Sequence, residues 1–495
     1  MRKEVSRPFL RRTIRFLLLI PLAGMALFVA ADLLLSRNLP DLAPWHELKP
    51  VNEFRADMAG PDFGWPQWLA LESRLFEEIG ELRSKAFSRI PLDHSRYQPG
   101  GNRFARRLSR DWNRSYLLQP ERPRGVALLL HGLSDSPYSL RSLALALREA
   151  GLNVYGLRLP GHGTVPAALD DIRWQDWLAA VEVVNRHIRR THPGLPFWMV
   201  GYSMGAALTL KHTLDMLDQG LAPPDGLCLL SPALGVNPLA RFANLQRLFS
   251  ELPFFRKSRW LSVLPEFDPY KYQSFTKNAG RQMALLTAEV DAGLKRLQAE
   301  GRAQDLPPVL SFQSVVDETV STQDLMDRLY GVIDDPRSEL VLFDINRISF
   351  FRDYTRFSPD RLIATLRTLG EKHFRLTLIT NVSEESAQVE ERSGLASGGP
   401  ERVRPLALAW PEDVYSLSHI ALPFPPDDPV YGYDARAEDG SPLDTLGNLA
   451  VRGERNVLSI PAADLLRLRA NPFHAYVVER ILEFTGRSRA AEGGE

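Results

Sequence analysis

The stretch Phe197-Trp198-Met199-Val200-Gly201-Tyr202-Ser203-Met204-Gly205-Ala206-Ala207 decides the fold of this chain. It reads as a short buried strand, a tight turn with Ser203 at its tip, and a helix that starts near Met204. Gly-x-Ser-x-Gly in that context is typical of a nucleophile elbow, in which a strained turn lifts the serine hydroxyl clear of a sheet. Gly201 and Gly205 lack a Cβ, so the helix can cross close to the strand.

Strands and helices alternate on both sides of this elbow. An apolar run over 126–130 leads into His131-Gly132, and a second run over 154–157 leads into Gly161-His162-Gly163. A third run, 227–230, holds Cys228. Short apolar strands that alternate with helices predict an α/β fold with a mostly parallel sheet and helices on both faces. Catalytic groups then belong in loops at the carboxyl ends of the strands.

With these motifs the chain resembles an α/β-hydrolase of the monoacylglycerol lipase and lysophospholipase type. The matching segments are His131-Gly132-Leu133, 159–163 and 201–205, and the likeness is good over 125–232 and thinner over 306–345 and 405–485. The resemblance implies an acyl-enzyme on Ser203 and an oxyanion hole made by the backbone N–H groups of Leu133 and Met204. It implies structural roles for His131 and His162, and it requires no metal or organic cofactor.

The acid of a catalytic triad is expected after the serine in this fold. Asp317 follows a predicted strand over 306–313, and its surroundings resemble the acid-bearing loop of the family. An N-cap role is the structural alternative for an aspartate at such a position. Glu318 and Asp344 are the rival carboxylates, the latter at the end of a predicted strand over 339–343.

The base is expected after the acid, and His419 in a Ser-rich loop fits that order better than His373 or His474. About a hundred residues separate Asp317 from His419, where compact relatives have far fewer. We therefore expect an insertion at about 346–410. It contains a strand-like 375–379 and a polar segment, 383–404, which we expect to be flexible.

The amino-terminal region has the pattern of a membrane anchor. Residues 2–15 are strongly basic, and Phe16 to Leu35 run apolar apart from Asp32. About twenty apolar residues suffice for a helix to cross a bilayer. Basic residues before the run favour a cytoplasmic N-terminus and an exported catalytic domain, periplasmic if the source is bacterial. The alternative is a signal peptide cleaved at 29–31, which would release a secreted protein.

These patterns divide the chain into four regions. They are a basic tail and transmembrane anchor (1–36), a tether with an amphipathic helix over 67–89 (37–100), an α/β-hydrolase core (101–231 and 305–490, with the insertion at about 346–410) and a cap or lid (232–304). The aromatic and aliphatic side chains of the predicted cap suit a hydrophobic acyl or aryl group.

Composition excludes other classes of function. Lys and Arg number 60, as do Asp and Glu, so no charge imbalance points to nucleic acid or to an acidic partner. Cysteine and histidine do not cluster at metal-ligand spacing, and the single cysteine excludes an intramolecular disulfide. Nothing in the sequence favours one oligomeric state.

The sequence therefore predicts a membrane-anchored serine hydrolase that cleaves carboxylic esters, with lipid-like acyl esters as substrates. A peptidase or an acyltransferase would use the same acyl-enzyme and remains an alternative. A further alternative is a non-catalytic binding protein of the envelope built on the same fold.

Overall fold

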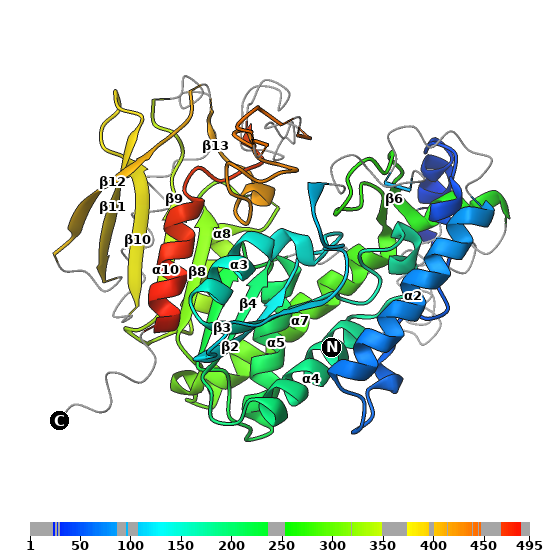
Figure 1. The fold of residues 1–495 in the computed structure, drawn as a ribbon, viewed down its shortest axis with the longest axis horizontal. Coiled ribbons are helices and arrows are strands. Elements are labelled where there is room, and N and C mark those ends of the chain that lie inside the picture. The colour runs from blue at the N-terminus through cyan, green and yellow to red at the C-terminus, as the bar shows by residue number, and fades with distance from the viewer. Residues whose placement is uncertain are drawn as a thin grey trace, which may run out of the picture.

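The computed structural model describes residues 23–24, 27, 30–86, 96–97, 107–235, 253–317, 319–348, 374–395, 400–412, 414–437, 439–443, 445–446 and 467–486. Its centre is a ten-stranded sheet in the order β1-β3-β2-β4-β5-β8-β9-β10-β11-β12 (Figure 1). The expected parallel α/β sheet is confirmed, because β2, β3, β4, β5, β8, β9 and β10 all pair in parallel.

The parallel strands are short and buried throughout. They are β2 (Gly125–Leu130), β3 (Leu152–Leu157), β4 (Phe197–Tyr202), β5 (Gly226–Leu230), β8 (Val309–Ser314), β9 (Glu339–Phe343) and β10 (Arg375–Asn381). The antiparallel β1 (Tyr116–Leu118) closes one edge beside β3. Side chains alternate between the two faces, so that in β2 Val126, Leu128 and Leu130 join one core while Ala127 and Leu129 join the other.

Helices cover both faces of the sheet. One face carries α4 (Trp174–Thr191), α5 (Met204–Asp218) and α7 (Lys277–Ala299), and the other carries α3 (Arg141–Glu149) and α10 (His474–Gly486) (Figure 1). Helix α7 lies inside the segment expected to form a lid. Its residues Leu286, Val290 and Leu294 are nevertheless buried in the main core, where α7 packs on α5. Helix α7 (277–299) thus packs with the body of the protein, and the expected cap boundary at 304 stays a prediction.

The insertion between acid and base extends the sheet. Strands β11 (Gln388–Leu395) and β12 (Arg402–Ala409) form an antiparallel pair on β10, so the segment 383–404, expected to be flexible, contains all of β11 and the start of β12. The sequence reads as polar because β12 is an edge strand whose first four residues are exposed. Charged side chains at a sheet edge are common in natural proteins, since they discourage pairing with other chains.

The amino-terminal segment wraps onto the body. The expected amphipathic helix is α2 (Trp65–Ala86), whose Trp68 and Leu71 enter the main core. Arg158, at the end of β3, is buried and donates to Glu72 at 2.9 Å and to Glu53 at 3.0 Å. This buried ion network ties both the tether and α2 to the sheet.

Most of the expected anchor over 16–35 lies outside the described residues. Within the part of the chain that the structure describes, no helix combines the length and apolar character needed to span a membrane. The described end of that segment, 30–36, is helical, and Asp32 accepts a hydrogen bond from Lys277 Nζ at 2.5 Å.

Candidate active site

Ser203 occupies a strained turn between β4 and α5. Its φ of 54° and ψ of −114° lie in a region that non-glycine residues rarely adopt. A Cβ on Gly201 would lie 2.5 Å from the backbone nitrogen of Ala206, and one on Gly205 would collide with the carbonyl oxygen of Leu130. The two glycines thus allow α5 to start directly against β4 and β2, as the elbow motif requires.

The structure brings together Ser203, His419 and Asp317 from three separate loops. The Ser203 Oγ lies 3.1 Å from His419 Nε2, and His419 Nδ1 lies 2.8 Å from Asp317 Oδ2. Because Nδ1–H donates to the carboxylate, Nε2 is left to accept the serine hydroxyl proton. The side chain of Asp317 is fully buried and that of His419 is 9% exposed. Water therefore does not compete for the bond between them.

Asp317 uses its two oxygens for different tasks. While Oδ2 faces His419, Oδ1 accepts the backbone N–H of Val320 at 3.0 Å, which fixes the plane of the carboxylate. The rival Asp344 is buried but turned elsewhere, accepting from Arg347 and Thr380 at 2.6 and 2.7 Å. Glu318, the other rival, lies outside the described residues.

Among the described residues, the only histidine hydrogen-bonded to the Ser203 hydroxyl is His419. His474 starts α10, where burial lowers its pKa to about 4, and His373 lies outside the described residues. His419 is instead held from two sides. The Tyr202 ring stacks on its imidazole with centroids 5.5 Å apart, and the Tyr202 hydroxyl donates to its carbonyl oxygen at 3.3 Å. Sequence reasoning missed this role of Tyr202, although the residue directly precedes the serine.

Two backbone N–H groups of interest follow the carboxyl ends of β2 and β4, which pair in parallel. Met204 begins α5, so its N–H belongs to the first helical turn, which has no intrahelical acceptor. Leu133 lies in the loop after β2, and among the described residues no acceptor is found for its N–H or for that of Met204. These are the two donors that the resemblance implied, and their role as an oxyanion hole stays a prediction.

A segment of the predicted cap contacts the loop after β2, residues 131–136, which we call the oxyanion loop after its predicted role. The backbone N–H of Tyr272 donates to the Ser134 carbonyl oxygen at 2.8 Å, where Ser134 has a φ of 66°. Lys271 Nζ also donates to Asp135 Oδ1 at 3.0 Å. These contacts span more than 130 residues along the chain and carry no local motif, so sequence reasoning could not find them.

His131 and His162 hydrogen-bond the backbone rather than the serine, as expected. His131 Nε2 accepts the Leu159 N–H at 3.0 Å, and its Nδ1 lies 2.8 Å from the Gly132 carbonyl oxygen. The Nδ1 of His162 lies 3.0 Å from the Pro160 carbonyl oxygen. Burial lowers the pKa of His131 well below its usual value and that of His162 to about 3. Both rings are therefore neutral near pH 7 and fix the two loops around the site.

A metal centre is not part of the described site. Across the described ranges, no three His, Cys, Asp or Glu side chains gather in a way that would hold a metal ion. The arrangement instead has the parts needed for nucleophilic catalysis: a strained hydroxyl, a base within reach and an orienting carboxylate.

The chain is similar to known hydrolases over the region from β2 to β9. A sequence profile of the family described as "Serine aminopeptidase, S33" matches residues 121–342. The chain is 39% identical over 202 residues to the thermostable monoacylglycerol lipase of Bacillus sp. (strain H-257), which covers 40% of this chain and 72% of that protein.

Solved structures of similar proteins include lipolytic enzymes. The chain is 22% identical to a structure reported for the metagenome-derived lipolytic enzymes LipS and LipT, with a TM-score of 0.37, covering 47% of this chain and 87% of that one. It is 17% identical to the monoacylglycerol lipase of Paleococcus ferrophilus, with a TM-score of 0.36, covering 46% of this chain and 88% of that one. At these low scores, the family assignment rests on the sequence match to the bacterial lipase.

Proposed function

This chain belongs to the α/β-hydrolase serine hydrolases of the lipase and esterase type, and we propose that it cleaves carboxylic acyl esters through an acyl-enzyme on Ser203. One observation carries the proposal. The Ser203 hydroxyl, the His419 imidazole and the Asp317 carboxylate form one line of hydrogen bonds, of 3.1 and 2.8 Å, in a buried site. Such a line activates a serine hydroxyl that is otherwise a weak nucleophile.

The proposed reaction has two halves. Ser203 Oγ attacks the acyl carbon while His419 Nε2 accepts the hydroxyl proton, and the N–H groups of Leu133 and Met204 hold the resulting oxyanion. The intermediate collapses as His419 donates its proton to the leaving alcohol. Water then attacks the acyl-enzyme by the same route and releases the acid. Asp317 stays ionised and keeps the imidazole in the tautomer that accepts at Nε2.

Lipid-like acyl esters are the proposed substrates. The sequence relative is a monoacylglycerol lipase, and the cap segment is rich in aromatic and aliphatic residues. Apolar walls with a few placed polar groups are usual for sites that bind acyl chains. The description of the matching family, by contrast, names a serine aminopeptidase. Cleavage of an N-terminal peptide bond is therefore the second candidate function.

Membrane attachment forms part of the proposal. The apolar run over 16–35 follows a basic segment, which favours a cytoplasmic N-terminus and an exported catalytic domain. Leu27, Leu34 and Leu35, all within this run, are 72%, 62% and 68% exposed. A bilayer would cover these side chains and would bring the enzyme close to its lipid substrate.

A fluorophosphonate probe tests the nucleophile. We expect the detergent-solubilised full chain to be labelled, Ser203→Ala to be unlabelled, and the exposed Ser441→Ala to be labelled like the wild type. A folded wild-type protein that takes up no label would favour a non-catalytic binding protein.

A substrate panel then separates the two candidates. p-Nitrophenyl esters of increasing chain length, monoacylglycerols and aminoacyl p-nitroanilides would be compared at equal enzyme concentration. We expect kcat/KM to be highest for a medium or long acyl ester. Faster turnover of an anilide, lost in Ser203→Ala, would contradict the ester assignment.

A further inference from the structure

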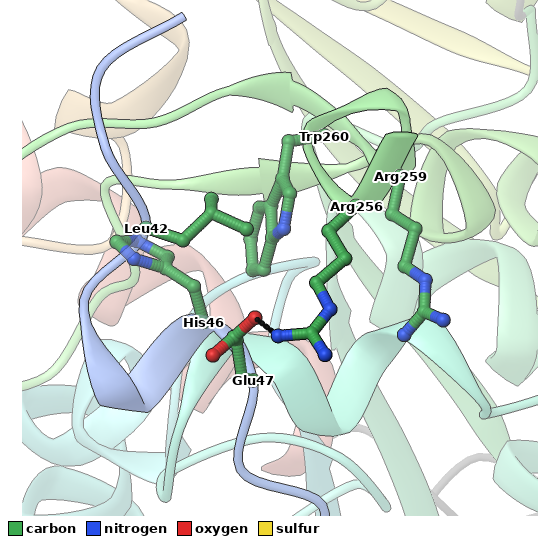
Figure 2. Close-up of a pocket in the computed structure, with 6 residues that line it drawn as sticks. All are labelled: Leu42, His46, Glu47, Arg256, Arg259 and Trp260. Atoms are coloured by element: carbon green, nitrogen blue, oxygen red, sulfur yellow. Dashed lines mark hydrogen bonds and ion pairs between the residues drawn. The ribbon is translucent and has the colours of Figure 1, made fainter. Parts of the chain in front are cut away.

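A cavity of about 260 Å³ lies between the amino-terminal tether and the cap, and it shares no lining residue with the proposed triad. Figure 2 shows the six side chains that line it. The tether contributes Leu42, His46 and Glu47, and the cap contributes Arg256, Arg259 and Trp260. The cap residues come from a short 3-10 helix (Pro253–Arg259) and from the start of β6 (Trp260–Ser262).

Two guanidinium groups give the cavity its chemistry. In Figure 2 the side chains of Arg256 and Arg259 run in the same direction from the cap. Glu47 is the only acidic residue among the lining side chains, and Asp170, behind the lining, lies 3.7 Å from Arg259, so each guanidinium group faces one carboxylate. Planar guanidinium groups match the oxygens of phosphate and carboxylate better than other side chains do, because they donate two hydrogen bonds at once.

The ion pair in the cavity is one that a ligand can replace. Arg256 Nη1 donates to Glu47 Oε1 at 2.9 Å, but the two side chains are 50% and 44% exposed. Exposed ion pairs contribute little to stability because water and salt screen them. An anion entering the cavity therefore competes for Arg256 at low cost. Arg259 is less exposed, at 17%, and lies 3.7 Å from Asp170.

Trp260 offers a second and independent sign of a ligand. Its side chain is buried, at 2% exposure, and its indole N–H has no hydrogen-bond partner among the described residues. Figure 2 shows the indole nitrogen on the edge of the ring that faces Arg256. A buried donor without an acceptor is costly, and a ligand oxygen between the indole and the arginine would satisfy it.

His46 fixes the indole without adding charge. Its ring meets that of Trp260 edge to face, with centroids 4.8 Å apart. Its Nδ1 accepts the Ala43 N–H at 2.9 Å, and its Nε2 lies 2.9 Å from Ser274 Oγ. Both ring nitrogens are thus engaged with the protein, and the ligand is left to the two arginines and the tryptophan.

We propose that this cavity binds a phosphate group, with the headgroup of an anionic phospholipid as its source. Two observations favour a lipid. The tether that lines the cavity directly follows the helical residues 30–36, and on the cap side Leu261 and Leu264 are 64% and 45% exposed. Apolar side chains around an arginine-lined cavity suit the boundary where lipid phosphates lie. The choice of a lipid rests on the membrane attachment proposed above, whereas binding of phosphate does not.

Calorimetric titration of the full chain in dodecyl maltoside tests the site. A Ser203→Ala background prevents turnover of the titrant. The probes are dihexanoyl phosphatidylglycerol, dihexanoyl phosphatidylcholine and inorganic phosphate, because short-chain lipids dissolve without a bilayer. We expect saturable binding of the phosphatidylglycerol, and weaker binding of the phosphatidylcholine, whose choline cation would lie against the arginines.

Substitutions assign the binding to the cavity. We expect Arg256→Gln with Arg259→Gln to raise the Kd about tenfold or more, since two charge-assisted hydrogen bonds are lost. Trp260→Phe keeps the ring, removes the donor and should raise the Kd by a smaller factor. The matched control is Arg436→Gln, which breaks another exposed arginine–carboxylate pair, that with Asp434 at 2.9 Å, and should leave the Kd within about twofold.

Circular dichroism melting curves check that each variant folds. If the double variant does not fold, the single variant Arg256→Gln, at a half-exposed position, replaces it. Binding that is absent, or that ignores all three substitutions, overturns the site. Inorganic phosphate binding as tightly as the phosphatidylglycerol, with the same dependence on the arginines, overturns the lipid as its source. Fluorophosphonate labelling of the same variants on the Ser203 background reports catalysis separately, so failure of the cavity and failure of the ester hydrolase are told apart.

Discussion

Replacing Asp317 with asparagine isolates the carboxylate while keeping its shape. The amide oxygen can still accept the Val320 N–H, now 3.0 Å from Oδ1, so the loop should keep its course. The amide NH₂ would then face His419 Nδ1 and donate to it. That forces the imidazole into the other tautomer, with a proton on Nε2 pointing at Ser203 and no lone pair to accept the hydroxyl proton.

The size of the effect follows from the burial of the pair. The Asp317 side chain has no exposure and that of His419 has 9%, so neither water nor buffer can take the place of the lost charge. The 2.8 Å distance is that of a charge-assisted hydrogen bond. Removing such a carboxylate from a serine–histidine pair lowers kcat by about 10⁴-fold, or about 5 kcal/mol in the activation free energy.

Steady-state hydrolysis of p-nitrophenyl butyrate by Asp317→Asn measures this loss, with circular dichroism to verify folding. The matched control is Asp344→Asn, which changes the rival buried carboxylate that binds Arg347 and Thr380. We expect the control to lower the melting temperature but to keep kcat within about threefold of wild type in the folded fraction. A folded Asp317→Asn with more than a tenth of the wild-type kcat, or a 10⁴-fold loss in Asp344→Asn, would refute the reasoning.

Three further outcomes can be checked. Lys271→Met removes the 3.0 Å hydrogen bond to Asp135 and should loosen the oxyanion loop. Steady-state kinetics should then show kcat lowered about tenfold with little change in KM. A tenfold change in KM as well would contradict this reasoning. Gly205→Ala should destabilise the protein by several kcal/mol in urea melts, because the added Cβ would meet the Leu130 carbonyl oxygen. As a control, Gly80→Ala in α2 has open space around it and should stabilise the protein by about 0.5 kcal/mol. Burial lowers the pKa of His212 to about 4, below the value of about 6.5 in an unfolded chain, so the unfolded state binds the proton first and stability falls as pH drops from about 6.5 towards 4. That group alone contributes a loss of about 3 kcal/mol in the free energy of unfolding, and His212→Leu should flatten the pH curve of stability measured by urea melts.

The parts of the fold that local sequence determines were predicted correctly. The elbow is one of them, because its glycines, its serine and its flanking apolar strand are consecutive residues. The parallel sheet is another, since each buried strand forms a continuous apolar run. His419 and Asp317 were singled out by their order along the chain and by the resemblance, and the structure places both beside Ser203.

The parts that depend on distant contacts were not predictable in the same way. Strands β11 and β12 read as a flexible polar segment because strands at a sheet edge need only one apolar face. Helix α7 has the amphipathic pattern of any surface helix, and only its contact with α5 shows that it packs with the body. The hold of Lys271 on Asp135 joins two residues 136 positions apart that carry no motif.

The buried ion network around Arg158 limits how far this protein can be shortened. The family profile begins at residue 121, which invites a truncation there to obtain a soluble catalytic unit. Such a truncation would remove Glu53 and Glu72, the two counter-charges of Arg158, together with α2, whose Trp68 and Leu71 are buried in the main core. The core surface that α2 covers would then face water, at a cost of roughly 1.5–3 kcal/mol for each large apolar side chain exposed, which is a sizeable part of the stability of a typical domain. A soluble version that is to remain folded must therefore begin ahead of Glu53.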